Sequence, residues 1–152
     1  MTPGRVNRAV VTERVFLIRR LLDEVGTLPL GDFDAFTRDP RMVAAGESYL
    51  RRALEALLDI ARHVLAKGFA RAPSEYAEVA RQLGDVQVVS REQAERLALM
   101  ARYRNRMVHG SHEVTARELY ELLTGRLDDI AETIAAIATW MAGHPDRVAD
   151  EE

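Results

Sequence analysis

Apolar residues recur at every third or fourth position along most of this chain, the spacing that gathers them on one side of an α-helix. The pattern is clearest in three stretches, carried by Val11, Val15, Ile18, Leu22, Val25, Leu50, Leu54, Leu57, Ala61, Val64, Leu119, Leu123, Ile130, Ile134, Ile137 and Met141. Only DVQVV at 85–89 has strand character, and a single strand has no partner for a sheet. We therefore expect an all-α protein with a loop at 85–89.

Proline, glycine and capping residues divide this pattern into helices. Gly26 and Pro29 end the first, Pro40 opens a long one that ends at Gly68, and DFDAF at 32–36 can form a short helical turn between them. A shorter helix begins at 73–74 and ends at 84. Capping boxes open the last two helices, formed by Ser90 with Gln93 and by Thr115 with Glu118. These boundaries predict one domain over 1–152, an up-and-down bundle of four main helices plus a short extra helix, with frayed tails at 1–7 and 143–152.

The composition excludes several classes of protein. The chain has no Cys, which rules out disulfides, thiolate metal sites and cysteine nucleophiles. No apolar run approaches the roughly 18 residues of a membrane span, and MTPGRVNRAV at the start has no signal-peptide core, so we expect a cytoplasmic protein. Because the net charge is −3 at pH 7, nucleic-acid binding would require a local basic patch.

One charged residue falls on the apolar side of the fourth helix. At 100° per residue, Arg104 lies near the middle of an apolar arc made by Leu97, Met100, Ala101, Met107 and Val108. Three polar residues lie away from the centre of this arc: Asn105 at its edge, and Arg102 and Arg106 on the opposite, polar side. Arginine is almost never fully buried without a partner. Arg104 therefore requires a carboxylate such as Glu55 or Asp59 of the long helix, a phosphate, or an open cleft.

His109 follows Arg104 by five residues, which places the two side chains about 140° apart on an ideal helix. They converge only if the helix ends near His109, as the C-capping residue Gly110 allows. Arg102 and His109 share a face but are separated by roughly 10 Å of rise, and the core-directed position favours Arg104. A structural interpretation stays open, in which His109 interacts with the helix dipole and Arg104 forms a buried ion pair.

The segment RNRMVHG at 104–110 resembles the signature of HEPN-domain ribonucleases, in which Arg is usually followed by Asn and, after a short spacer, by His. Arg104, Asn105 and His109 match this signature. The segments ALEALLDIARHVLAKG and LYELLTGRLDDIAETIAAI resemble the second and last helices of the HepT-like HEPN toxins. The resemblance covers about residues 8–140 and implies a HEPN-like helical bundle.

The resemblance implies a metal-independent endoribonuclease toxin without a cofactor, in which the RNA 2′-hydroxyl attacks the adjacent phosphate and leaves a 2′,3′-cyclic phosphate. His109 would act as general base or acid, and Arg104 would stabilise charge on the phosphoryl oxygens. Asn105 would orient His109 or contact the phosphate. Arg102 and Arg106 would bind the RNA backbone, although a solvated polar helix face explains each of them, taken alone, slightly better. No carboxylate cluster accompanies His109, so no metal site is expected.

The resemblance also implies two protein partners. One is a second copy, in a homodimer with facing motifs; the other is a nucleotidyltransferase (MNT) antitoxin that attaches AMP to a Tyr two residues after the motif His. This chain has Ser111 at that position, so Ser111 or His112 would have to take the modification. Two other functions stay open: a non-catalytic partner of a nucleotidyltransferase, and a plain helical dimerisation domain with Arg104 in a salt bridge.

Overall fold

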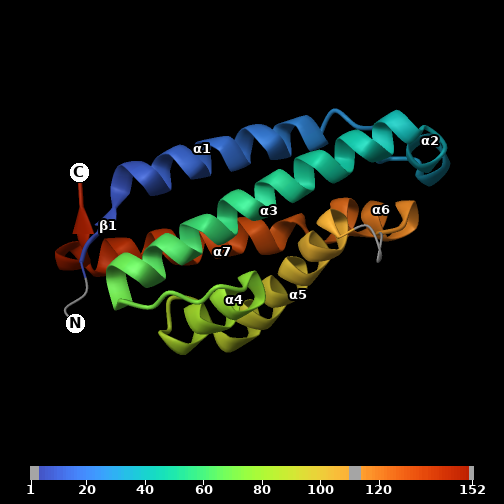
Figure 1. The fold of residues 1–152 in the computed structure, drawn as a ribbon. Helices are drawn as coiled ribbons and strands as arrows, with labels where there is room; N and C mark the ends of the chain where they lie inside the picture. The colour runs from blue at the N-terminus through green and yellow to red at the C-terminus, as the bar shows by residue number, and fades with distance from the viewer. Residues whose placement is uncertain (1–3, 110–113, 151–152) are drawn as a thin grey trace.

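The chain folds into a bundle of helices around one long central helix (Figure 1). The computed structural model describes residues 4–109 and 114–150. Over these residues the elements are β1 (Val6–Asn7), α1 (Arg8–Val25), α2 (Phe33–Thr37), α3 (Pro40–Phe69), α4 (Tyr76–Asp85), α5 (Arg91–Val108), α6 (Ala116–Gly125), α7 (Leu127–Gly143), a 3-10 turn (Pro145–Arg147) and β2 (Val148–Ala149). Helix α3 is 30 residues long and packs against every other α-helix of this part of the chain.

The prediction of an all-α, single-domain bundle is confirmed, with α1, α3, α5 and α7 as its four main helices. Of the three short helices in the described chain, α2 matches the helical turn expected at 32–36 and α4 matches the short extra helix, while α6 was not expected as a separate helix. The helix predicted over 116–141 is divided at Arg126, whose backbone angles are φ −125° and ψ 1°. Leu123 and Ile130 are buried on either side of this break, so the apolar spacing continues across it and gives no sign of it.

The predicted helix beginnings are mostly confirmed. Both capping boxes are complete, with each N-cap side chain accepting from the backbone three residues on and the return bond also present. Asp39 caps α3 directly before Pro40, which occupies the first helical position. Helix α4 begins at Tyr76, slightly later than predicted, and 85–89 forms a loop as expected.

The prediction of frayed tails is wrong for residues 6–7 and 143–150. Strand β1 pairs in parallel with β2, with Val6 opposite Val148. Val6 is fully buried, and the Asn7 N–H donates to His63 Nε2 at 2.9 Å. The two ends of the chain are therefore joined beside the C-terminal end of α3 (Figure 1). The polar composition of both tails concealed the single buried valine that each contributes.

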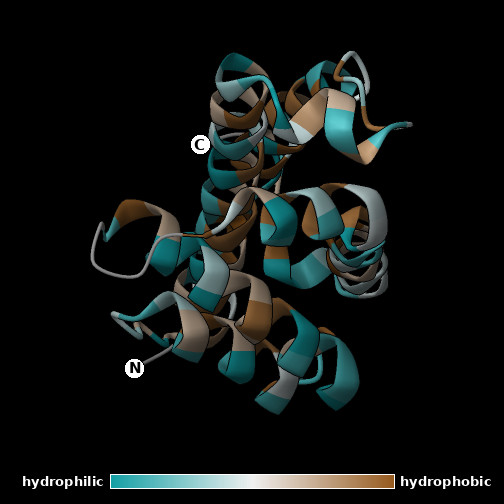
Figure 2. Ribbon diagram, turned by 90° about the vertical axis from the view of Figure 1, so that its right-hand side faces the viewer, coloured by the Kyte–Doolittle hydropathy of each residue, from teal (hydrophilic) through white to brown (hydrophobic). Residues whose placement is uncertain are grey.

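The core lies along α3 and is formed by one side of each surrounding helix. In Figure 2, brown apolar and teal polar segments alternate along the helices, as expected for helices that bury one side. The largest fully buried side chains are Phe36, Ile18, Leu50, Leu54, Leu57, Leu58, Ile60, Leu65, Leu83, Leu97, Met100 and Leu119. Within residues 4–109 and 114–150, no helix combines the length and apolar character needed to cross a membrane.

Candidate active site

Helix α5 carries the Arg104–His109 segment at its C-terminal end. The helix ends at Val108, and His109 is its C-cap with an extended backbone (φ −105°, ψ 100°). The His109 N–H still donates to the Asn105 carbonyl at 3.0 Å, so the chain leaves the helical path at His109 itself. From the sequence, the side chains of Arg104 and His109 could approach each other only if the helix ended near His109, and α5 does end there.

Arg104, Asn105 and His109 line one surface pocket of about 290 Å³. Its other lining residues come from α3, from the loop after it and from the start of α4: Arg62, Ser74, Glu75 and Tyr76. The lining is mainly polar and includes the guanidinium groups of Arg62 and Arg104. Among the described residues, no three His, Asp or Glu side chains are grouped so that they could hold a metal ion.

Arg104 is held by the carboxylate of Glu55 on α3. Arg104 Nε donates to Glu55 Oε2 at 2.9 Å, Nη2 lies 2.8 Å from the same oxygen as an ion pair, and Nη1 donates to Asn105 Oδ1 at 3.2 Å. The expected carboxylate partner is therefore present, and it is Glu55 rather than Asp59. Both side chains are about a quarter exposed, at 23% and 24%. Each terminal nitrogen of Arg104 keeps a further N–H, because a guanidinium has five N–H donors.

Tyr76, at the start of α4, is a pocket residue that the sequence did not single out. Its ring lies against two guanidinium groups, with the Cζ atoms of Arg62 and Arg104 at 4.7 and 4.9 Å from the ring centroid. Its hydroxyl donates to Asp59 Oδ1 at 2.8 Å. Burial raises the pKa of Tyr76, and the bond to Asp59 raises this pKa further, so the phenol stays protonated at neutral pH.

A row of charged residues on α3 supports the pocket. Arg51, Glu55, Asp59 and Arg62 are spaced by four, four and three residues and therefore share one face. Arg51 donates to Glu55 at 3.2 Å, and Asp59 lies 3.7 Å from Arg62 and 3.7 Å from Arg14 of α1. The helical spacing of two acidic residues between two arginines is the sequence signal that could have revealed the supporting residues. No comparable pattern identifies Tyr76.

Arg106 links α5 to α6 and does not line the pocket. Its two terminal nitrogens donate to the two oxygens of Glu118, each at 2.9 Å, and its guanidinium lies 5.4 Å from the Tyr103 ring centroid. The bond from Arg106 is the main cause that lowers the pKa of Glu118 to about 2, and the Thr115 N–H, which also bonds Glu118, adds to it. The described contacts thus give Arg106 a structural role, while the prediction that it binds RNA stays a prediction.

The remaining residues of the predicted site lie at its margin. Arg102 is exposed on the polar side of α5, as expected, and does not line the pocket. Val108 was expected in the buried arc but is 40% exposed, because α5 ends there beyond its contact with the core. Tyr103 and Tyr120 are partly buried and pack against the core. Ser111, the candidate for modification, lies outside the described residues.

The pocket has the groups needed to bind and act on a phosphate ester. Guanidinium N–H groups of Arg104 and Arg62 can donate to anionic oxygens, and the exposed imidazole of His109 can donate or accept a proton. The half-buried Asn105 adds an amide that both donates and accepts. The same arrangement also suits binding without chemistry, so the geometry alone defines a class of ligand rather than a reaction.

The fold has close structural counterparts of low sequence identity. A tri-AMPylated HEPN toxin of Shewanella oneidensis, solved in complex with an MNT antitoxin, superposes with a TM-score of 0.79 at 21% identity, covering 86% of this chain and 97% of that one. YutE, a cytosolic protein of unknown function from Bacillus subtilis, gives 0.80 at 18% identity, covering 96% and 98%. A toxin–antitoxin structure with AMP-PNP gives 0.77 at 21% identity, covering 84% and 97%. At such identities these likenesses show the fold alone.

The sequence itself carries the family assignment. A search of curated proteins gives no match to this chain. A family model described as ribonuclease HepT-like matches residues 18–137, which include most of the helical bundle and the whole Arg104–His109 segment. The match extends over well more than half of the chain, so this protein belongs to the HepT-like ribonuclease family.

Proposed function

We propose that this protein is a metal-independent endoribonuclease toxin that cleaves RNA at the pocket formed by Arg104, Asn105 and His109. The observation that carries the proposal is the shared pocket, since α5 ends where His109 can join Arg104. Membership of the HepT-like ribonuclease family supports the choice of RNA as substrate. Cleavage produces a 2′,3′-cyclic phosphate and a 5′-hydroxyl.

The reaction consists of one displacement at phosphorus with two proton transfers. The ribose 2′-oxygen loses its proton to a general base and attacks the adjacent phosphorus. The bond to the 5′-oxygen breaks, and a general acid protonates this leaving group. His109 supplies the imidazole, and the Arg104 guanidinium binds the phosphoryl oxygens as charge develops on them. One imidazole cannot be base and acid in the same displacement, so a homodimer with facing motifs provides the second His109.

Glu55 sets how Arg104 meets the phosphate. The Nε–Nη2 edge of Arg104 is occupied by Glu55, which leaves the outward N–H groups of the two terminal nitrogens for phosphoryl oxygens. Asn105 holds Nη1 from the other side. The guanidinium is therefore oriented before RNA binds, and little reorganisation is required when charge develops in the transition state.

A nucleotidyltransferase antitoxin is the proposed protein partner, in the cytoplasm. Structures with this fold include a tri-AMPylated HEPN toxin held by an MNT antitoxin, which supports neutralisation by AMP transfer to the toxin. In this chain the acceptor hydroxyl would be Ser111, a weaker nucleophile than the Tyr of the family. The cytosolic description of YutE supports the assignment to the cytoplasm.

The test is cleavage of bulk RNA by the purified protein in EDTA, with analysis of the new termini. We expect cyclic-phosphate ends that are lost, with activity at least about 100-fold lower, in His109→Ala and Arg104→Ala. His144→Ala is the matched control, because His144 is exposed after α7, stacks on Trp140 and lines a different pocket. Absence of cleavage by a folded dimer over varied RNAs would refute the proposal.

A non-catalytic binding module is the second candidate, and the engagement of Arg104 by Glu55 favours it. In such a module Arg104 and Arg62 hold a phosphate-containing ligand without transferring a proton. RNA or nucleotide binding that survives His109→Ala but is lost in Arg104→Ala, in a wild-type protein with no cleavage, would establish this alternative.

A further inference from the structure

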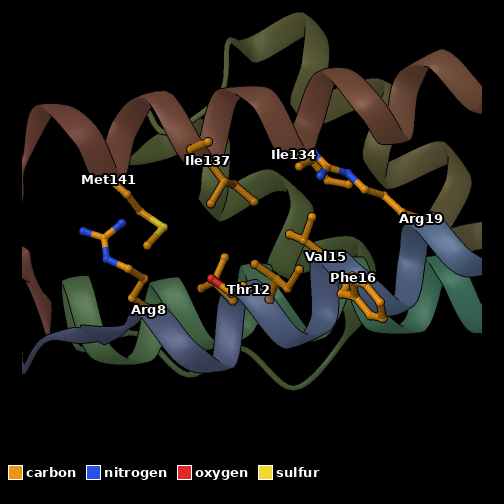
Figure 3. A pocket seen from close by; sticks show the side chains of 11 residues that line it. Arg8, Thr12, Val15, Phe16, Arg19, Ile134, Ile137 and Met141 are labelled. Carbon is orange, nitrogen blue, oxygen red and sulfur yellow. The ribbon is translucent and has the colours of Figure 1, made fainter. Parts of the chain in front are cut away.

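A second, apolar pocket lies between α1 and α7 (Figure 3). Its volume is about 340 Å³, and it reaches Ile60 of α3. Ile60 and Arg62 are two residues apart on α3, so their side chains point about 200° apart and the apolar pocket is separate from the pocket of Arg104. Most of its lining is apolar, and Arg8, Thr12 and Arg19 also line it. The apolar lining residues include Val11, Val15, Ile60, Ile134, Ile137 and Met141.

Phe16 stands at the rim of this pocket. Its side chain is 65% exposed, the largest exposure of any large apolar residue in the described chain. In Figure 3 its ring lies on α1 beside Val15, and the pocket opens between it and α7. The exposed residue of α7 that lines the pocket is the small Ala138. A projecting aromatic ring and an apolar hollow thus form one continuous surface, which we call the α1–α7 face.

Two exposed side chains of opposite charge flank Phe16 on α1. Glu13 lies three residues before it and Arg20 four residues after it, and both are exposed. Seven residues apart, these two side chains lie within about 20° of each other around the helix. When two such helices pack antiparallel with their Phe16 side chains together, Glu13 of one copy lies opposite Arg20 of the other, and this pair occurs twice.

We infer that the α1–α7 face is a contact with a second copy of this chain, related by a two-fold axis near Phe16. An isologous contact must be complementary to itself. This face supplies both the ring and the hollow, and the ridge of α1 that carries Phe16 beside it supplies both the acid and the base, Glu13 and Arg20. Phe16 of each copy enters the apolar pocket of the other. The contact is separate from a dimer with facing motifs, so it does not depend on the proposed ribonuclease activity, and both contacts together give an assembly larger than a dimer.

Sedimentation velocity over a wide range of protein concentration tests the contact through its apolar part. We expect Phe16→Glu to lose one association step that the wild type shows, from tetramer to dimer or from dimer to monomer. The dissociation constant of that step should rise at least about tenfold. Glu121→Arg, at an exposed position on α6, is the control and should leave the association unchanged. Circular dichroism checks that each variant is folded.

Charge reversal tests the predicted pairing itself. Glu13→Arg and Arg20→Glu should each weaken the association, and the double variant with both changes should restore it, because the charges are then exchanged across the contact. A wild type that stays monomeric at all concentrations, an association unchanged by Phe16→Glu, or a double variant as weak as the single ones would each overturn the inference.

Discussion

At the scale of single residues, the unusual feature is a charge that is both paired and accessible. Arg104 forms a hydrogen bond and an ion pair with Glu55, yet about a quarter of each side chain is exposed at the pocket. A purely structural ion pair gains from full enclosure, whereas a group that binds ligand must keep part of itself in solvent. The partial exposure of Arg104 is that of a group that binds ligand. Replacing Arg104 should therefore lower the free energy of unfolding less than breaking a fully enclosed ion pair would.

Arg104→Ala should lower the free energy of unfolding by about 1–2 kcal/mol, less than the 3–5 kcal/mol typical of breaking a fully buried pair. Glu55 keeps Arg51 at 3.2 Å and stays partly hydrated after the change. Urea denaturation measures the difference, with the exposed Arg102→Ala expected to cost less than about 0.5 kcal/mol. A loss above about 4 kcal/mol would favour the plain dimerisation domain, in which Arg104 serves only stability.

Tyr76 should matter for activity through its ring more than through its hydroxyl. Tyr76→Phe keeps the ring against the guanidinium groups of Arg62 and Arg104 and loses the bond to Asp59, which retains Arg14 and Arg62 as partners. We expect kcat within about threefold of wild type for Tyr76→Phe and a loss of about tenfold for Tyr76→Leu, since displacing Arg104 weakens a transition-state contact.

Single-turnover RNA cleavage separates these two Tyr76 variants from effects on binding. Ser74→Ala, in the same loop and pocket, serves as the control, because its backbone carbonyl rather than its side chain holds Arg62. Equal losses in Tyr76→Phe and Tyr76→Leu would assign the role to the hydroxyl and contradict the argument from the ring.

At the scale of helices and loops, the joint between α5 and α6 depends on one bidentate pair. Glu118 completes the capping box of α6 and also accepts both terminal nitrogens of Arg106. This pair directly joins the end of α5 to the first turn of α6. The orientation of the end of α5, and with it His109, depends on this connection.

The stability that Glu118 contributes should disappear in acid. Its folded-state pKa is about 2, below the ordinary value of 4.5, so the stabilisation is complete above about pH 5.5 and is lost as the pH falls toward 2. The difference in unfolding free energy between wild type and Glu118→Gln should therefore be constant at neutral pH and shrink through this window. Urea titrations at a series of pH values measure it; Glu121→Gln, exposed on the same helix, should show no such change.

Gly84 allows α4 to approach α5 closely. A Cβ on Gly84 would lie 2.7 Å from the Ala94 Cβ, which is closer than two carbon atoms can pack. Gly84→Ala should therefore lower the unfolding free energy by about 1–3 kcal/mol, and adding Ala94→Gly should recover much of this loss. Gly143→Ala, with nothing near its Cβ position, is the matched control in thermal or urea unfolding. No recovery in the double variant would mean that the loss has another origin.

The sequence predicted those parts of the fold that depend on local rules. Helix starts follow from caps, and the end of α5 follows from the glycine after His109. The break at Arg126 could not be predicted, because the buried residues of α6 and α7 keep the same helical spacing across it and give one continuous apolar pattern. Glu55 could be predicted as a partner because an Arg on the apolar side of a helix requires a carboxylate. Tyr76 could not be predicted, because its position beside Arg104 depends on how α4 packs across α5, and no short stretch of sequence determines that packing.

At the scale of the whole molecule, the central question is how many chains form one active site. The Arg104 pocket and the α1–α7 face lie on different sides of α3, so one contact between copies leaves the other surface free. Each pocket has a single motif His, His109, although displacement at phosphorus uses a base and an acid. If facing motifs complete the site, catalysis belongs to the dimer and not to the chain.

Mixing wild type with Arg104→Ala/His109→Ala protein should reveal such a shared site. After subunits exchange, mixed dimers would have one intact motif and be inactive, so an equal mixture should show about one quarter of the activity of the same total amount of wild type. Independent sites would instead give about one half of it. RNA cleavage across a range of mixing ratios distinguishes a squared from a linear dependence on the wild-type fraction. Phe16→Glu in both chains should leave the squared dependence intact, because the α1–α7 face is separate from the motif.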